Sequence, residues 1–348
     1  MISEIGKDTT RRRFIQTAGL AASACSLHGD AHSKQKAIMT PEESLSKLVD
    51  CLGGPWPAPC PLNQQISGTI QKDGYRIETL TFDAETNDPI PAHLLIPDGV
   101  SDSSPAPAVA VWHQHGGQYH LGKSEPAGLD GDPMHHTGLA LAKLGYVVLC
   151  PDALCFEDRQ DPAKKLSGGK FERYEFLRYV VNGKSMAWKN ILDMRRAVDL
   201  LVSRPEVDSE RLGCYGHSMG STHTWLVGPH EPRLKALVAN CCLPTYAAIH
   251  DEKILHCFPN FVPGWLQYGD TPEIASLVAP RALHLNLGET DGGSPIKEAK
   301  AGVERIRAAY LNQGAEENFS AFIQPDTGHV LSPEMWEQTK AFFEKYLG

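Results

Sequence analysis

The sequence has no apolar run long enough to cross a bilayer and no extended cluster of basic residues. A membrane-spanning helix needs about 20 consecutive, mostly apolar residues, and no segment of the 348-residue chain supplies them. The formal net charge is −9, which disfavours nucleic acid or an anionic membrane surface as a partner. Internal repeats and low-complexity tracts are also missing. These absences argue against a membrane-spanning or nucleic-acid-binding protein and say little about a neutral substrate.

The cysteine pattern excludes the common structural zinc sites. Nine cysteines are present, but none forms a Cys-x-x-Cys pair. Cys51 and Cys60 flank a proline-rich loop, and the sequence leaves open whether they form a disulfide or remain free thiols. Four more lie at or near the ends of expected strands, where cysteine acts as a small buried hydrophobe: Cys150, Cys214, Cys241 and Cys242.

The first 25 residues are typical of an export signal. Thr-Arg-Arg-Arg-Phe-Ile-Gln at residues 10–16 resembles the twin-arginine motif, and a weakly apolar stretch follows at 17–24. We therefore expect a periplasmic or extracellular protein; the alternative is a disordered basic tail. Cys25 follows Ala-Ser-Ala and is a candidate for a lipid anchor. Residues 26–74 are expected to form a linker and extension, and residues 75–348 a single catalytic domain.

Eight segments predict strands, and helical patterns separate the later ones. The first two alternate polar and apolar residues, as half-buried antiparallel strands do, and most of the others are short apolar runs typical of buried parallel strands. The predicted fold class is α/β, an α/β-hydrolase fold with a mostly parallel eight-stranded sheet and helices on both faces. The strands are expected at residues 76–83, 92–97, 107–112, 146–150, 211–215, 235–240, 281–287 and 319–324.

Two further segments do not belong to the predicted sheet or to the helices that cover it. Residues 154–183 and 243–270 leave the carboxyl ends of strands, where open α/β sheets bind ligands. Helices are expected at residues 41–50, 137–144, 185–203, 219–227, 297–313 and 333–347. The two extra segments are therefore predicted to be insertions that wall a substrate cleft.

Residues 216–220 read Gly-His-Ser-Met-Gly and match the Gly-x-Ser-x-Gly pattern. The motif lies directly between an expected strand and an expected helix, which is the context that its chemistry requires. A serine at such a sharp turn is raised above the sheet edge, and glycines on either side avoid steric collisions. Ser218 is therefore the candidate nucleophile.

A serine hydroxyl needs a base, and the base needs an orienting acid. Asp291 follows the seventh strand in a tight loop, and His329 follows the eighth, in the order serine, acid, histidine. Glu289 is the alternative acid because it lies even closer to the strand end. His329 is the only histidine after Asp291. The predicted triad is Ser218, Asp291 and His329.

The loop after the third predicted strand reads His-Gln-His-Gly-Gly-Gln-Tyr-His at residues 113–120. We expect an oxyanion hole formed by the N–H of Met219, after the nucleophile, and by that of Gly117 or Gln118 in this loop. The many histidines nearby also permit a metal-site hypothesis, but histidines that brace the loop or touch substrate explain the pattern better. They are His113, His115, His120, His135 and His136, with Asp130 and Asp132.

These motifs together resemble the dienelactone hydrolase-like and acetyl xylan esterase-like branch of the α/β-hydrolase superfamily. Arg-Pro-Glu-Val-Asp at 204–208 and Ala-Pro-Arg-Ala at 279–282 add to the resemblance, which covers about residues 75–347. It implies ester hydrolysis through an acyl-enzyme without a metal or organic cofactor. Dienelactone hydrolases typically carry a cysteine nucleophile, whereas this chain has Ser218.

The favoured hypothesis is an exported serine esterase that acts on a small-molecule or carbohydrate ester, such as an acetyl xylan-type substrate. A peptidase or amidase on the same scaffold is the second hypothesis. A non-catalytic binding protein is the third, although such proteins usually lose a member of the triad.

Overall fold

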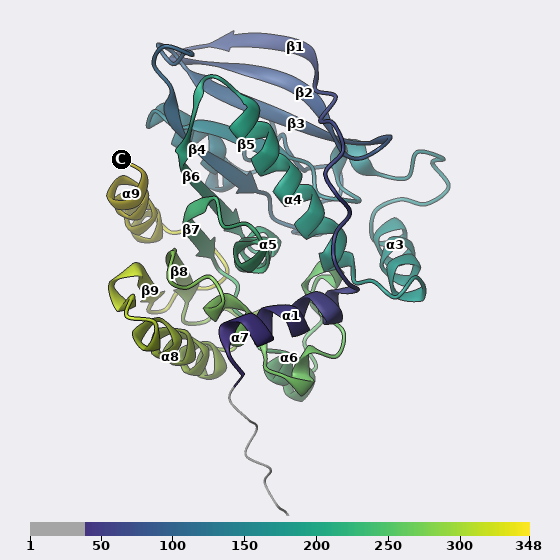
Figure 1. Cartoon of the computed structure of the whole chain (residues 1–348), viewed down its shortest axis with the longest axis vertical. Helices are drawn as coiled ribbons and strands as arrows, with labels where there is room; N and C mark the ends of the chain where they lie inside the picture. Colours follow the sequence, from purple (N-terminus) through teal and green to yellow (C-terminus); the bar gives the residue numbers. More distant parts are fainter. Residues whose placement is uncertain (1–38) are drawn as a thin grey trace, which may run out of the picture. The chain divides into compact units, whose positions relative to one another are not determined.

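The computed structural model describes residues 39–348, which form one compact unit (Figure 1). The expected export signal and Cys25 lie outside the described residues. Among the helices of residues 39–348, none is long and apolar enough to cross a membrane.

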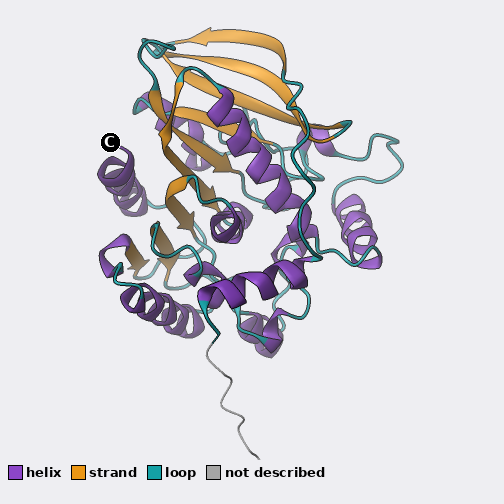
Figure 2. Ribbon diagram, viewed as in Figure 1, coloured by secondary structure: helices purple, strands orange, loops and turns teal. Residues whose placement is uncertain are grey.

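A nine-stranded mixed sheet forms the centre of this unit (Figure 2). Its spatial order is β1-β2-β3-β5-β4-β6-β7-β8-β9. The three pairs β1/β2, β2/β3 and β3/β5 are antiparallel, and the remaining neighbours are parallel. The strands are β1 (Gln65–Lys72), β2 (Tyr75–Glu85), β3 (Asp88–Pro97), β4 (Ala106–Trp112), β5 (Val147–Pro151), β6 (Val207–His217), β7 (Leu234–Asn240), β8 (Ala282–Gly288) and β9 (Phe319–Gln324).

The predicted fold class is confirmed, but the expected number of strands was one too low. All eight predicted strands are present, and β1 is added at the edge of the sheet. Every residue of β1 is exposed, so the strand has no buried face that a hydrophobic pattern could reveal. Pairing with β2 holds it in place.

The compact unit begins at Met39 rather than at residue 75. Residues 39–74, expected to form a linker and extension, contribute α1 (Pro41–Leu52) and β1. The α1 helix begins as predicted, with Thr40 as its cap and Pro41 in its first turn. Leu48 and Leu52 on α1 are fully buried in the main core, so this segment is part of the domain.

Helices cover both faces of the sheet, as the strand-helix alternation requires. One core lies between the sheet and a set of helices that includes α4 and α5, and a second core contains residues of α2 and α9. The helices beyond α1 are α2 (Thr137–Lys143), α3 (Gly169–Val181), α4 (Met186–Ser203), α5 (Met219–Val227), α6 (Tyr246–Glu252), α7 (Thr271–Ser276), α8 (Ile296–Asn312) and α9 (Pro333–Leu347).

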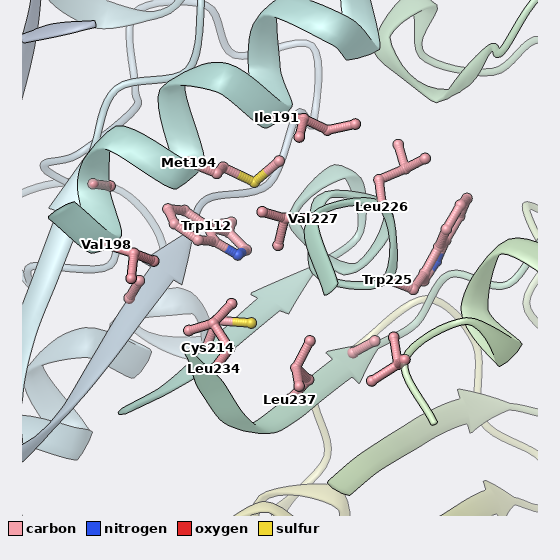
Figure 3. Packing of buried hydrophobic residues seen from close by; sticks show 14 of the residues in the cluster. Trp112, Ile191, Met194, Val198, Cys214, Trp225, Leu226, Val227, Leu234 and Leu237 are labelled. Carbon is pink, nitrogen blue, oxygen red and sulfur yellow. The ribbon is translucent and has the colours of Figure 1, made fainter. Parts of the chain in front are cut away.

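Alternate side chains of strand β4 are buried in different cores. Ala108, Ala110 and Trp112 belong to the first core, and Val109 and Val111 belong to the second, because successive side chains of a strand point to opposite faces. Figure 3 shows the first core, where Trp112 lies among side chains of α4, α5, β6 and β7. This burial on both faces fixes the position of β4 and therefore of the loop that leaves it.

Candidate active site

The turn that carries Ser218 joins β6 directly to α5. Ser218 has φ 59° and ψ −117°, a left-handed conformation that side-chain-bearing residues rarely adopt. Its N–H donates to the carbonyl oxygen of Asn240 at 2.9 Å, which ties the turn to the end of β7. The strained turn lifts the hydroxyl out of line with the strand.

The two glycines of the motif are required by close backbone contact. A Cβ at Gly216 would lie 2.0 Å from the carbonyl oxygen of Gly220, and a Cβ at Gly220 would lie 2.0 Å from the carbonyl oxygen of Trp112. The helix start is therefore packed against both the strand that precedes it and the end of β4. The N–H of Met219 is in the first turn of α5, where it has no acceptor within the helix.

Asp291 and His329 form a hydrogen-bonded pair on two loops that pack together. His329 Nδ1 lies 2.7 Å from Asp291 Oδ2, and the Asp291 side chain is 2% exposed while that of His329 is 41% exposed. Because Nδ1–H donates to the carboxylate, Nε2 of the neutral ring is left as the basic nitrogen. The Thr290 N–H donates to the Thr327 carbonyl oxygen at 2.8 Å and holds the two loops together.

The alternative acid, Glu289, has a different partner. Its carboxylate lies 3.2 Å from Lys300 Nζ, at the exposed start of α8. The structure therefore pairs His329 with Asp291 and directs Glu289 toward a lysine.

His329 also lies beside the turn that carries Ser218. Its ring centroid is 5.2 Å from that of His217, the residue before Ser218. The Cys241 thiol donates to the Val330 carbonyl oxygen at 2.8 Å, which connects the end of β7 to the loop that carries His329. Ser218, Asp291 and His329 thus come from three strand ends that meet at one edge of the sheet.

The loop after β4 is held by its own histidines. His113 is buried, and its Nε2 accepts from the N–H of Ala153 at 3.0 Å. Its Nδ1 therefore carries the proton and donates to the Gln114 carbonyl oxygen at 2.7 Å. Burial lowers the pKa of His113 to about 4, which keeps the ring neutral.

The two loop residues named as oxyanion donors already have acceptors within the loop. The Gly117 N–H donates to His115 Nδ1, and the Gln118 N–H donates to the His115 carbonyl oxygen, each at 3.0 Å. Gly116 and Gly117 both have positive φ, at 50° and 71°, which explains the glycine pair. A substrate would have to displace these bonds to use either N–H.

The histidines of the metal hypothesis have separate partners. His136 Nε2 bonds to the Asp130 carbonyl oxygen, His135 packs on His217, and His120 is exposed. Three clustered carboxylates occur elsewhere in the described chain, and Lys123 Nζ sits among them at 3.0, 2.6 and 2.7 Å. An ammonium group therefore holds the position that a cation would take; the three acids are Asp152, Glu157 and Asp158.

The two predicted insertions meet beside the nucleophile turn. Phe176 on α3 stacks on Phe258 of the second insertion with ring centroids 4.8 Å apart. Met219, next to Ser218, is buried in the small apolar cluster that these insertions share. The cluster supports the prediction that the insertions form walls beside Ser218.

Two insertion residues near the site were missed by the sequence analysis. Burial is the main reason that the pKa of His256 falls to about 4, and the charge of His329 contributes to the decrease. Glu172 on α3 is 2% exposed and binds His115. Both residues lie in segments without a recognisable motif, so their position within the insertions was the available signal.

The sequence left open whether Cys51 and Cys60 form a disulfide. Cys51 and Cys60 are both free thiols in the structure. Cys150, Cys214, Cys241 and Cys242 are buried, as expected for small hydrophobes.

Comparison with known proteins identifies the family of this chain. The Dienelactone hydrolase family matches residues 91–254. A Bacillus subtilis (strain 168) protein described as "Putative hydrolase YtaP" is 30% identical over 291 residues, which cover 82% of this chain and 93% of that protein. The chain therefore belongs to the dienelactone hydrolase family and is a carboxylic-ester hydrolase.

Two solved structures share the α/β-hydrolase fold. A glucuronoyl esterase from Solibacter usitatus superposes with a TM-score of 0.66 at 15% identity, covering 88% of this chain and 92% of that one. An acetyl xylan esterase from Paenibacillus sp. R4 superposes with a TM-score of 0.59 at 19% identity, covering 83% and 90%. At such low identity these similarities show the fold.

Proposed function

We propose that the protein is an exported serine esterase that cleaves carbohydrate esters through an acyl-enzyme. The observation that carries the proposal is the 2.7 Å hydrogen bond between His329 and Asp291 beside the strained turn of Ser218. The expected twin-arginine signal at residues 1–25 supports export. The acetyl xylan and glucuronoyl esterases with the same fold support a carbohydrate ester as the substrate.

The proposed reaction assigns one role to each residue. His329 Nε2 takes the proton from the Ser218 hydroxyl as Oγ attacks the ester carbonyl carbon, and Asp291 stabilises the imidazolium that forms. The Met219 N–H, with a second N–H from the loop after β4, stabilises the oxyanion of the tetrahedral intermediate. His329 then protonates the leaving alcohol, and water hydrolyses the acyl-enzyme by the reverse proton path.

The test compares the two candidate acids in otherwise identical variants. We expect Asp291→Asn to lower kcat for p-nitrophenyl acetate by about 10⁴-fold, as loss of the orienting carboxylate does in serine hydrolases. Glu289→Gln should stay within about threefold of the parent, because Glu289 pairs with Lys300. Ser218→Ala should abolish turnover and labelling by a fluorophosphonate. Full activity in Asp291→Asn, or turnover by Ser218→Ala, would disprove the mechanism.

A substrate panel separates the proposed function from its alternatives. We expect acetylated xylo-oligosaccharides to be cleaved with a higher kcat/KM than aminoacyl anilides. A preference for the anilides would identify an amidase. Lack of fluorophosphonate labelling of Ser218 in the folded protein would support a binding protein instead.

A further inference from the structure

The triad does not account for a buried carboxylate in the first insertion. Glu172 lies in the first turn of α3 and is 2% exposed. Removing a carboxylate from water is costly unless hydrogen bonds replace those lost to water. Its donors are the Tyr119 hydroxyl at 2.6 Å and His115 Nε2 at 3.2 Å to both oxygens. Both donors come from the loop after β4, so the insertion is bonded directly to the candidate oxyanion loop.

The hydrogen bonds of His115 fix its tautomer. A backbone N–H can only donate, so His115 Nδ1 must be unprotonated to accept from Gly117 at 3.0 Å. The single ring proton is then on Nε2, where it faces Glu172. Glu172 therefore favours the tautomer that lets His115 hold the Gly117 N–H.

The Gly116-Gly117 segment is held by hydrogen bonds rather than by side-chain packing. Gly116 and Gly117 both have positive φ, and a Cβ at Gly117 would touch nothing within 4 Å, so side-chain packing does not restrain this point. The His115 ring is held on edge by Tyr119 and Phe156, with centroids 5.0 and 5.1 Å away. These ring contacts therefore hold His115 in place beside Gly117.

The loop starts beside the nucleophile turn. Trp112 pairs with Gly216 across β4 and β6, and a Cβ on Gly220 would lie 3.0 Å from the His113 carbonyl oxygen. A small shift of the loop would therefore change its position relative to Ser218. In the proposed mechanism an N–H of this loop acts on charge that develops in the transition state, and misplacement of such a donor affects kcat more than KM.

We propose that Glu172 and His115 are positioning residues that connect the α3 wall of the cleft to the oxyanion loop. The proposal rests on the proposed esterase function. Glu172 orients His115, and His115 orients the Gly116-Gly117 segment of the loop. Through these contacts α3 of the first insertion sets the geometry of the candidate oxyanion loop.

A matched pair of substitutions isolates the link to Gly117. His115→Leu removes both ring nitrogens, whereas His115→Asn places an amide oxygen near the position of Nδ1 and can still accept from Gly117. Neither variant can reach Glu172, so they differ mainly at the loop. We expect His115→Leu to lower kcat by about 100-fold, the size of effect that a 1 Å displacement can have, with KM within about threefold. His115→Asn should recover most of that loss.

A double-mutant cycle tests the link to Glu172. We expect Glu172→Leu to lower kcat about tenfold in the parent, but to add little in the His115→Asn background, because the shorter side chain no longer contacts residue 172. Arg173→Gln is the control, since it changes an exposed neighbour of Glu172 on α3 and leaves the Glu172–His115 and His115–Gly117 bonds intact. It should keep kcat within about threefold.

Fluorophosphonate labelling of Ser218 separates this proposal from the proposed function. Folded parent protein that fails to label, or labelling that survives Ser218→Ala, counts against the triad. If the parent labels, its rate is compared across the variants, with circular dichroism as the check on folding. Equal rates for His115→Leu and His115→Asn, or a full Glu172→Leu effect in the His115→Asn background, would overturn the connection. If His115→Leu does not fold, the double-mutant cycle of Glu172→Leu and His115→Asn is the test of the proposal.

Discussion

At the scale of single residues, the absence of a side chain at Gly220 allows the start of α5 to pack against the end of β4. We expect Gly220→Ala to destabilise the protein by about 3 kcal/mol, the upper end for overpacking, because the new Cβ would lie 2.0 Å from the Trp112 carbonyl oxygen. A flexible side chain could move aside, but a backbone carbonyl within a sheet cannot. Urea denaturation gives the free energy of unfolding.

Gly68 provides the control for this substitution. A Cβ at Gly68 on the edge strand β1 would meet nothing within 4 Å, so Gly68→Ala should change stability by less than about 0.5 kcal/mol. Equal stability of the two variants would show that the contact at Gly220 can relax.

The residues of the candidate triad could be proposed from the sequence because motif, order and strand ends all converge on them. Ser218, Asp291 and His329 each follow a strand whose apolar pattern is clear. Glu172 and His256 could not be found in this way, since neither belongs to a motif and both depend on how an insertion folds back. The partner of Glu172, His115, lies far away in the sequence.

At the scale of elements, a buried ion cluster attaches the first insertion to α4. Arg159 Nη1 lies 2.6 Å and Lys189 Nζ 2.5 Å from the two oxygens of Asp193, and Asp88 pairs with both cations. We expect Asp193→Asn to destabilise the protein by about 3–5 kcal/mol, because two buried cations would then share one carboxylate. Chemical denaturation measures the loss.

An exposed ion pair is the matched control. Asp208 bonds to Arg211 at 2.7 Å, with side chains 30% and 39% exposed. Asp208→Asn should therefore cost less than about 1 kcal/mol. A comparable loss in both variants would mean that burial does not set the strength of the Asp193 cluster.

Elements were predictable where burial leaves a pattern. The helix at Pro333–Leu347 was placed at its true limits because Ser332 and Pro333 mark its start. The edge strand β1 was not predicted because its sequence, Gln-Ile-Ser-Gly-Thr-Ile-Gln-Lys, has no buried face. Its strand conformation depends on the partner β2.

At the scale of the whole molecule, several imidazoles are buried in the neutral state. Burial lowers the pKa to about 4 at His93, His113 and His284, and to about 3 at His223 and His230. In the unfolded chain the value is about 6.5. The unfolded state therefore binds more protons between these values, and stability that is complete above about pH 6.5 is lost as the pH falls toward 4.

We expect the free energy of unfolding to decrease steeply between pH 6.5 and pH 4. A fully buried imidazole such as His113 contributes on the order of 3 kcal/mol across its shift. Burial raises the pKa of Asp152 to about 7, which has the opposite sign, but one carboxyl group is outweighed by five imidazoles. Urea denaturation at pH 7, 6, 5 and 4.5 gives the slope.

One substitution should weaken the pH dependence of the free energy of unfolding, and another should leave it unchanged. His230→Leu removes an imidazole whose Nε2 is buried without a partner among the described residues, so its pH dependence should be shallower. His120→Asn, at an exposed position, should leave the slope unchanged. Identical slopes in all three proteins would show that buried histidines do not govern acid sensitivity.

The two insertions are separate in the sequence from the strand ends that carry the candidate triad, so they can be exchanged by protein engineering. One insertion follows β5 and the other follows β7, while the strand ends that carry Ser218, Asp291 and His329 belong to the frame. We expect that a foreign segment grafted between β5 and α4 would change selectivity without altering the candidate nucleophile, acid or base. If Glu172 positions the loop as we propose, such a graft must also present an acceptor at its place, because without it new esters would bind but be turned over slowly.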